Sequence, residues 1–253
     1  MNNPVKVSII TISFNAEKTI EHTIQSVVSQ SYKNIEYIVI DGNSKDDTKS
    51  IIEKYKHNIA YFISEPDNGL YDALNKGLAI STGDIIGIIH SDDFYPHSEV
   101  ISSIVNMFEN NSDCNAISSS VHIFKQNKFD RPFRVYDATK FKNWQLKLGI
   151  QPPHPGFFIT RKALDIVGYF RPFYKISGDF EWFVRFYLIH HLTSFSTNYV
   201  SVHMRDGGLS SSGFKSKKLM NAEDLKALKA NGIYSNMFII YLKYIIKIFQ
   251  LKF

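Results

Sequence analysis

The sequence is poor in cysteine. Of its 253 residues only Cys114 is a cysteine, which excludes a disulfide framework, a cysteine-rich zinc site and an iron–sulfur cluster. Hydrophobic residues make up 44% of the chain and charged residues 21%, so a disordered chain and a coiled coil are also excluded. The length suits one large α/β domain with a real core, or one domain with appendages.

Three common motifs for nucleotide binding or hydrolysis are missing. No Gly-x-Gly-x-x-Gly follows the first apolar run, and no Gly-x-x-x-x-Gly-Lys-Ser/Thr occurs anywhere. Their absence argues against a dinucleotide-dependent dehydrogenase and against a P-loop NTPase. Gly-x-Ser-x-Gly is absent too, which weakens the case for an α/β-hydrolase.

Long hydrophobic runs are missing as well. The first 15 residues hold only the apolar stretch 7–12, which is too short for a signal peptide and has no small-residue cleavage pattern after it. We therefore expect a mature start and a cytoplasmic protein. Lys and Arg exceed Asp and Glu by five, 29 against 24. That mild excess permits an anionic partner but demands none, and we expect no nucleic-acid partner.

The sequence does contain an alternation of strand and helix patterns, clearest in its first half. Short strand–helix repeats predict right-handed crossovers and a mostly parallel sheet. The expected strands are 5–12, 35–40, 59–63, 84–89, 115–124, 157–160 and 199–204, and the expected helices are 16–30, 45–56, 70–81, 97–110 and 178–190.

Polar clusters follow three of the expected strands, at 13–15, 41–44 and 91–93. In a parallel sheet, ligands bind at the carboxyl ends of the strands, so we expect the three clusters to converge on one edge. Asp92 and Asp93 are adjacent carboxylates, which are costly unless they are solvated or neutralised. A divalent cation bound to a diphosphate would neutralise them; the alternative is a solvated turn.

Asp41 also ends an expected strand. One interpretation is that its carboxylate accepts a hydrogen bond from the N–H group of a nucleotide base. The other is that the run from Asp41 to Thr48 forms a turn and a helix N-cap, for which Gly, Asn, Ser and Asp are well suited.

Taken together, these stretches resemble the opening of a family 2 glycosyltransferase. The resemblance is carried by Val7-Ser-Ile-Ile-Thr-Ile-Ser-Phe-Asn15, Glu36-Tyr-Ile-Val-Ile-Asp-Gly-Asn-Ser44 and Ser64-Glu-Pro-Asp-Asn-Gly-Leu-Tyr-Asp-Ala-Leu-Asn-Lys-Gly77. The resemblance is close from residue 5 to about 95. Beyond that point the matches are fewer and lie at 155–158 and 178–185. Each motif alone is weak, but jointly they are highly specific.

The resemblance implies a GT-A fold, with a mostly parallel central sheet flanked by helices, and an inverting transfer of sugar from a nucleoside diphosphate. It also implies a divalent metal, Mn²⁺ or Mg²⁺. In the family's Asp-x-Asp-type motif the first carboxylate is replaced here by Ser91. The implied contacts are Ser13, Asn15, Asp41, Asn75 and Asp92 for the nucleotide sugar, and Asp93 with Asp92 for the metal. Leu74 stands where many members have an Arg that reaches the nucleotide, so Lys76 and Arg205 are candidates for compensating the charge of the diphosphate.

The segment 177–185 resembles the family segment that carries the catalytic base. Gly178 stands where the family usually has Glu, while Asp179 and Arg185 keep the family spacing. Inversion needs a carboxylate that takes the proton of the acceptor hydroxyl, so the resemblance makes Asp179 the base, with Glu181 in reserve. A helix N-cap is the alternative role for Asp179.

The C-terminal stretch 236–253 is dense in Ile, Phe and Tyr. A bilayer-spanning helix needs about 20 mainly apolar residues, and this run is shorter and contains Lys243 and Lys247. At 100° per residue these lysines share one face and Ile239, Leu242 and Ile246 lie largely opposite. The pattern predicts an amphipathic helix on an anionic membrane surface; the alternative is a final helix that packs on the core or on a partner.

We expect an enzyme that lies peripherally on the inner face of the cytoplasmic membrane. The resemblance implies that it moves a sugar from a nucleoside-diphosphate donor, UDP-linked, to a hydroxyl of a lipid-linked oligosaccharide in surface-polysaccharide synthesis. We expect a nucleotide-sugar half at 1–95, an acceptor half at 96–214 and a helical tail at 215–253. The alternatives are a polyprenyl-phosphate glycosyl synthase, which needs no base, and a non-catalytic sugar-nucleotide-binding subunit.

Overall fold

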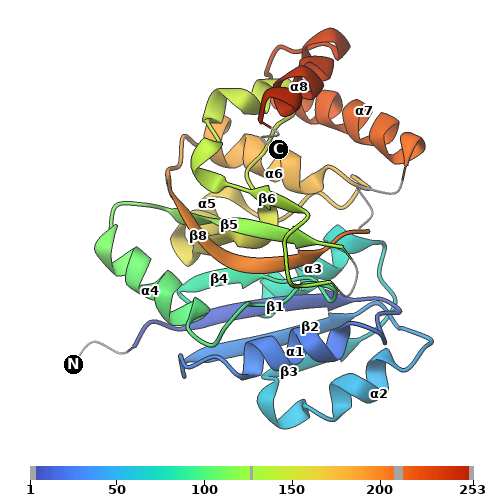
Figure 1. Ribbon diagram of the computed structural model, residues 1–253, viewed down its shortest axis with the longest axis vertical. Helices are drawn as coiled ribbons and strands as arrows, with labels where there is room; N and C mark the ends of the chain where they lie inside the picture. Colours follow the sequence, from blue (N-terminus) through green and yellow to red (C-terminus); the bar gives the residue numbers. More distant parts are fainter. Residues whose placement is uncertain (1–3, 126–127, 208–212, 251–253) are drawn as a thin grey trace.

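The computed structural model of the chain describes residues 4–125, 128–207 and 213–250 (Figure 1). One eight-stranded sheet runs through the molecule in the order β3-β2-β1-β4-β7-β5-β6, and β8 pairs with β5. The strands are β1 (Val7–Ser13), β2 (Ile35–Asp41), β3 (Tyr61–Ser64), β4 (Ile85–Ile88), β5 (Ala116–Phe124), β6 (Arg134–Tyr136), β7 (Phe157–Thr160) and β8 (Ser194–Arg205).

The predicted α/β fold is confirmed, and every expected strand and helix is present with its ends moved by a few residues. β1 pairs in parallel with β2 and β4, and β2 with β3. β7 is antiparallel to both of its neighbours and β6 to β5, whereas β8 is parallel to β5. The helices are α1 (Ile20–Val28), α2 (Thr48–Glu53), α3 (Leu70–Ile80), α4 (Val100–Asn110), α5 (Arg161–Val167), α6 (Gly178–Val184), α7 (Phe214–Ala230) and α8 (Met237–Gln250).

Two hydrophobic cores lie on opposite faces of the sheet. Successive residues of a strand point to opposite faces, so Ile10 and Ile12 of β1 pack in the core that α3, α5 and α6 cover. Val7 and Ile9 of the same strand pack in the core that α1, α2 and α4 cover. Helices therefore flank a sheet that is buried on both faces, which explains why its strands read as near-continuous apolar runs.

The last two helices, α7 and α8, form one end of the molecule (top in Figure 1). The predicted direction of Lys243 is wrong: its side chain is 1% exposed, and Nζ lies 2.7 Å from Oδ2 of Asp224 on α7. Because that carboxylate is buried beneath α8, the lysine faces inward, and Phe238, Tyr241 and Ile245 face solvent instead. The side chains of Lys247, Phe249 and Gln250 lie outside the described part. None of the helices in the described ranges is long and apolar enough to cross a bilayer.

Candidate active site

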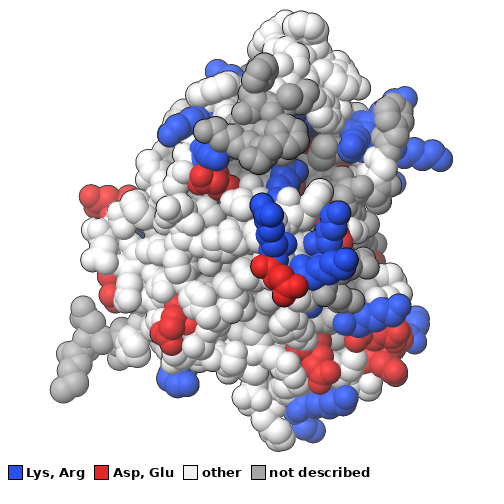
Figure 2. Space-filling view, viewed as in Figure 1, with Lys and Arg blue, Asp and Glu red and all other residues white. Residues whose placement is uncertain are grey.

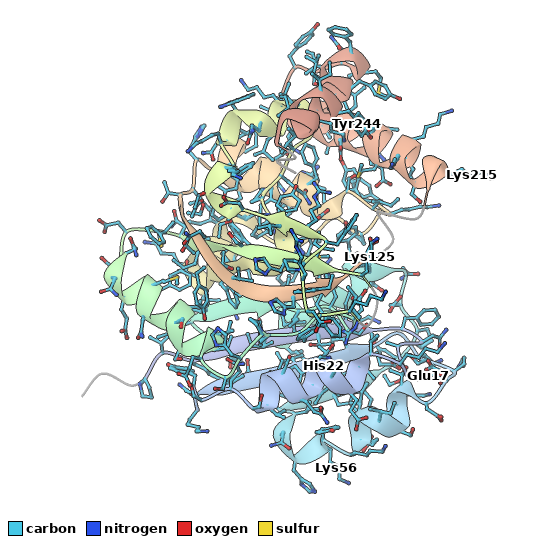
Figure 3. The ribbon with its side chains drawn as sticks, viewed as in Figure 1. Glu17, His22, Lys56, Lys125, Lys215 and Tyr244 are labelled. Atoms are coloured by element: carbon cyan, nitrogen blue, oxygen red, sulfur yellow. The ribbon has the colours of Figure 1, made fainter. Side chains whose placement is uncertain are left out.

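The three polar clusters converge on one edge of the sheet, as the strand pattern predicts. In the parallel register Ser13 lies opposite Asp41, and Asp41 lies opposite Ser64. β4 ends beside them at Ile88, and the segment 90–93 follows it. Figure 3 labels Glu17, which comes shortly after β1, at the right-hand side of the view where this edge lies.

Asp41 is fully buried and holds the loops of this edge together. Its carboxylate accepts hydrogen bonds from Ser13 Oγ (3.1 Å), Ser44 N (2.9 Å), Ser44 Oγ (2.5 Å) and Ser64 Oγ (2.7 Å). Asn15 joins the same loops, because its N–H donates to Ser44 Oγ and its Oδ1 accepts from the N–H of Lys45. The structure thus gives Asp41 the turn-forming role that was one of its two interpretations.

An exposed aromatic ring borders these loops, and sequence reasoning did not single it out. Phe14 is 64% exposed. A Cβ added to Gly42 would lie 3.2 Å from the Phe14 ring and 2.5 Å from Asp67 Oδ2, so Phe14 and Asp67 both approach the backbone of Gly42 closely. The edge therefore presents an exposed aromatic ring that packs against the buried backbone of Gly42.

The two aspartates after β4 differ in their surroundings. Asp92 is partly exposed, whereas Asp93 is 1% exposed. Neither carboxylate oxygen of Asp93 has a hydrogen-bond partner among the described residues. Burial, and then the charge of Asp92, raises the pKa of Asp93 well above its usual range. An orphaned buried carboxylate of this kind is unusual in native proteins, and a cation would satisfy it.

Arg205, at the end of β8, lies against these aspartates. It donates from Nη1 to the backbone oxygen of Asp92 (2.5 Å) and from Nη2 to Nδ1 of His22 (2.7 Å); His22 projects from α1 (Figure 3). Its guanidinium also lies 5.1 Å from the centre of the Phe94 ring. The structure thus brings Arg205 next to Asp92 and Asp93, which precede it by more than 110 residues in the chain.

Two other candidates near the nucleotide edge have partners already. Asn75 donates to the backbone oxygen of Phe170 (2.8 Å) and accepts from the N–H of Phe170 (2.9 Å), so both polar atoms of its amide are engaged. Lys76 pairs with Glu65 at 2.8 Å. The structure therefore gives Asn75 a role in locking the loop at Phe170, and its contact with the nucleotide stays a prediction.

Asp179 occupies the first turn of α6, and two side chains from distant segments bind its carboxylate. The hydroxyl of Tyr71 lies 3.1 Å from Oδ1, and Nε2 of Gln151 lies 2.5 Å from Oδ2. The turn before α6 is held by Glu223 of α7, whose carboxylate accepts from three successive N–H groups, those of residues 175–177, each at 2.9 Å. The position of Asp179 is thus fixed from three sides.

The reserve candidate for the base, Glu181, is wrong. Its side chain is fully buried. Its carboxylate lies 3.1 Å from Arg185 Nε and 3.3 Å from Arg171 Nε, and Asn231 donates to it at 3.0 Å. A carboxylate engaged in this way has no free oxygen to take a proton from a substrate.

Two histidines lie beside Asp179. The rings of His90 and His154 have their centres 5.9 Å apart. Burial lowers the pKa of both, that of His154 to about 4, while the charge of Asp179 acts in the opposite direction on each. Burial therefore favours the neutral form of both rings. His90 also feels the charge of Asp92, so the aspartate pair and Asp179 border the same site.

Sequence reasoning missed Tyr71, Gln151 and His90 as site residues. Tyr71 lies inside one of the motifs that carry the resemblance, and His90 directly precedes the Ser91-Asp92-Asp93 cluster, so their positions gave a signal. Gln151 lies in an irregular loop that no pattern marks. Within the described ranges no three His, Cys, Asp or Glu side chains come together in a group that could hold a metal by itself.

The site thus combines carboxylates at the strand ends of an α/β sheet with the carboxylate of Asp179 on α6. Comparison with known proteins identifies the class, because the family model "Glycosyl transferase family 2" matches residues 8–186. The chain belongs to glycosyl transferase family 2, and its class of activity is glycosyl transfer.

Individual relatives support the same assignment. An uncharacterised glycosyltransferase of Mycobacterium tuberculosis is 31% identical over 191 residues, which are 75% of this chain and 71% of that protein. A UDP-Glc:alpha-D-GlcNAc-diphosphoundecaprenol beta-1,3-glucosyltransferase of Escherichia coli is 38% identical over 99 residues, 39% of each chain. The crystal structure of M. tuberculosis glucosyl-3-phosphoglycerate synthase with Mg²⁺ and UDP has a similar fold, with a TM-score of 0.60 at 19% identity over 92% of this chain and 81% of that one.

Proposed function

We propose that the protein transfers a sugar from a UDP-sugar, with inversion, to a hydroxyl of a lipid-linked saccharide in bacterial surface-polysaccharide synthesis. The observation that carries the proposal is the carboxylate of Asp179, held by two donors across a shared site from Asp92 and Asp93. The E. coli relative uses UDP-Glc and a lipid diphosphate-linked GlcNAc acceptor, which supports the choice of donor and acceptor class.

The donor nucleotide would lie at the edge formed by the loops after β1, β2 and β3. The exposed ring of Phe14 offers a face on which a planar base can stack, and Ser13 and Asn15 line the same edge. The main role of Asp41 would be structural: its four hydrogen bonds keep these loops in one arrangement.

The residues present fit a divalent cation. Asp93 offers two buried oxygens without hydrogen-bond partners in the described part of the chain, and Asp92 offers a carboxylate at the surface of the site. These two would hold Mn²⁺ or Mg²⁺, which favour carboxylate oxygens. When bound, the cation would stabilise the negative charge on the departing diphosphate. Arg205, beside both aspartates, adds positive charge at this place.

The transfer itself would be a single displacement. Asp179 accepts the proton of the acceptor hydroxyl while the oxygen of that hydroxyl bonds to the anomeric carbon. The bond between the anomeric carbon and the UDP oxygen breaks in the same step, and UDP takes the electron pair. Because the attack comes from the side opposite UDP, the configuration at the anomeric carbon is inverted.

The chain would divide along these tasks. Residues 1–95 would supply the nucleotide-sugar half, residues 96–214 the acceptor half and residues 215–253 the helical tail. In the described part of the tail, Glu223 accepts from the N–H groups of residues 175–177, and Ser235 donates to the backbone oxygen of Lys147. The family model ends at residue 186, so the tail lies beyond the part that it matches.

The end of the molecule formed by α8 would rest on the inner face of the cytoplasmic membrane. Figure 2 shows this apex without charged side chains and with Lys and Arg on its flanks. Its exposed apolar side chains are Tyr234, Phe238, Tyr241 and Ile245, which are between 49% and 81% exposed. An apolar surface with basic flanks is the pattern of interfacial membrane binding, and a lipid-linked acceptor makes such docking useful.

The test is transfer from UDP-glucose and other UDP-sugars to synthetic GlcNAc-diphospholipid, with Mn²⁺ or Mg²⁺, scored by mass spectrometry of the product. Asp179→Asn should reduce the rate by a factor on the order of 10² to 10⁴ and leave UDP binding unchanged. Asp165→Asn, an exposed aspartate on α5, is the matched control. A near-normal rate for Asp179→Asn would contradict the assigned base and favour an acceptor that is already an anion.

A further inference from the structure

The segment that joins β5 to β6 carries a cluster of positive charge. Residues 125–134 read Lys-Gln-Asn-Lys-Phe-Asp-Arg-Pro-Phe-Arg, with four basic residues and one acidic residue. Lys125, Lys128 and Arg131 are exposed. Figure 2 shows basic side chains gathered at the middle of the molecule, where Figure 3 labels Lys125. We call the part of this stretch that the structure describes, residues 125 and 128–134, the basic hairpin.

The cations of the basic hairpin have no acidic partner among the described residues. Lys125 and Arg134 lie instead over aromatic rings, those of Phe133 at 5.0 Å and Tyr136 at 5.3 Å. By contrast, Lys76 is paired with Glu65 and Lys243 with Asp224. The positive charge of the hairpin is therefore available to an anion.

One side of the basic hairpin lies on the aspartate site. The ring of Phe129 packs 5.0 Å from the ring of Phe94, which directly follows Asp93, and 5.2 Å from the guanidinium of Arg205. Arg205 in turn donates to the backbone oxygen of Asp92. Through Phe129 the basic hairpin thus contacts Arg205 and Phe94, which adjoin the residues proposed to hold the metal and the donor diphosphate.

The other side of the basic hairpin reaches toward the base. Tyr136, at the end of β6, contacts the loop of Gln151 through its hydroxyl at 3.4 Å from the backbone oxygen. Gln151 donates to Asp179, and the charge of Asp179 is felt at Tyr136. The basic hairpin contacts the aspartate side of the site through Phe129, and strand β6, in which it ends, contacts the loop of Gln151 through Tyr136.

We propose that the basic hairpin binds the diphosphate of the lipid-linked acceptor. This inference rests on the proposed function, because the acceptor hydroxyl must lie at Asp179. In such an acceptor a doubly charged diphosphate is attached to the sugar that carries the nucleophilic hydroxyl. The donor diphosphate has its own place at Asp92, Asp93 and Arg205, which leaves the cations of the hairpin for the second diphosphate.

A direct binding experiment tests the proposal without turnover. The probe is farnesyl diphosphate, titrated into the full-length protein in EDTA so that the aspartate pair contributes no metal-bridged contact. The variant is Lys125→Gln/Lys128→Gln/Arg131→Gln, which leaves Arg134 in β6 unchanged. We expect its affinity to be about tenfold weaker than that of the wild type, and the wild-type affinity to fall with salt. Farnesol should bind neither protein measurably.

The matched control replaces three exposed lysines of the first half, Lys33→Gln/Lys54→Gln/Lys56→Gln. Figure 3 places Lys56 at the far end of the molecule from Lys125. This control has the same loss of net charge and should bind farnesyl diphosphate like the wild type. If both triple variants bind farnesyl diphosphate equally more weakly than the wild type, the effect is one of net charge and the proposal is overturned. An unchanged affinity in the hairpin variant would also overturn it.

Steady-state kinetics then distinguish an effect on the acceptor diphosphate from an effect on the donor diphosphate. In the hairpin variant KM for GlcNAc-diphospholipid should rise about tenfold, while KM for UDP-glucose stays constant. A GlcNAc glycoside with a neutral alkyl chain should be used equally by variant and wild type. A rise in KM for UDP-glucose alone would assign the hairpin to the donor and overturn the proposal. If the wild type binds farnesyl diphosphate through the hairpin but transfers to no lipid acceptor, the proposed function fails, and the hairpin is a lipid-diphosphate site without a role in transfer.

Discussion

The ring of Tyr71 fills the space beside Gly178 where any other residue would carry its Cβ. A Cβ at Gly178 would lie 2.6 Å from the Tyr71 ring. The hydroxyl of the same tyrosine donates to the backbone oxygen of Ile176 at 2.6 Å and lies 3.1 Å from Asp179 Oδ1. This packing explains why glycine stands where the family usually has Glu: the tyrosine needs that space to reach the carboxylate of Asp179.

We predict that Tyr71 and Gln151 are positioning residues for Asp179. Tyr71→Phe and Gln151→Met should each lower kcat about tenfold, because each removes one donor that orients the carboxylate. KM for UDP-glucose should not change. In an Asp179→Asn background neither substitution should lower the residual rate further, since both act through Asp179. A loss of the same size in that background would mean that the two residues merely stabilise the fold.

The buried pair of Lys243 and Asp224 should make the tail part of the folded core. Removing one partner leaves an unpaired buried charge, so Lys243→Met should lower the free energy of unfolding by about 3 kcal/mol, measured by urea denaturation. Lys243→Met/Asp224→Leu should recover much of that loss. Truncation after Gly232 should lower the melting temperature as well. A truncated protein that melts like the wild type would show that α8 does not pack on the core in solution.

Membrane binding should depend on the exposed face of α8. Phe238→Ser/Tyr241→Ser/Ile245→Ser should weaken co-sedimentation with phosphatidylglycerol-containing vesicles about tenfold, because these side chains would enter the headgroup region. The melting temperature should stay within a few degrees, since all three are exposed. Tyr61→Ser/Ile166→Ser, with exposed apolar residues elsewhere, is the control. A wild-type protein that ignores the vesicles would rule out this docking.

Asp93 should be required for metal-dependent nucleotide binding. With Mn²⁺, UDP should raise the melting temperature of the wild type, because a ligand that binds the native state stabilises it. Asp93→Asn should lose most of that increase. In EDTA the variant should melt no lower than the wild type, because an amide avoids burying an unpaired charge. If UDP and Mn²⁺ stabilise the variant as much as the wild type, Asp93 is not a ligand.

Glu36 should make stability depend on pH at the opposite end of the strands. Burial opposes its ionised form, but hydrogen bonds from Lys6, Ser8 and Thr82 lower the pKa of Glu36 to about 2. A lowered pKa in the folded state adds stability above the unfolded pKa, and that stability is lost as the pH falls toward 2. Glu36→Gln should therefore cost on the order of 2 kcal/mol at pH 7, and the difference should shrink between pH 5 and 2. A difference that does not change with pH would contradict this.

Part of the site followed from local patterns. Apolar runs fix where a strand ends, and parallel strands end at one edge, so the convergence of the clusters at Ser13, Asp41 and Asp92 could be predicted without the structure. The way in which Asp41 joins the loops after β1, β2 and β3 could not be predicted. It depends on the strand register, which places Ser13 and Ser64 opposite Asp41.

The choice between two carboxylates on one helix depended on packing. Asp179 and Glu181 are two residues apart, and the sequence alone gives both the type of group a base needs. Only the arrangement of α6 against its neighbours buries Glu181 beside Arg185 and Arg171 and leaves Asp179 between Tyr71 and Gln151. The partners of both come from segments that no local pattern connects.

The C-terminal tail shows most clearly which features the sequence determines and which depend on tertiary packing. The sequence by itself predicted a helix with apolar and polar positions within 236–253, because helical periodicity is a property of neighbouring residues, and α8 (Met237–Gln250) confirms the helix in the described part. It did not determine which face turns inward, because that depends on what lies beneath the helix. Asp224, on a different helix, supplies a buried opposite charge, so Lys243 points into the protein and Phe238 and Tyr241 point out. Local order fixes the faces of an element, and contacts between distant segments decide which face meets the core.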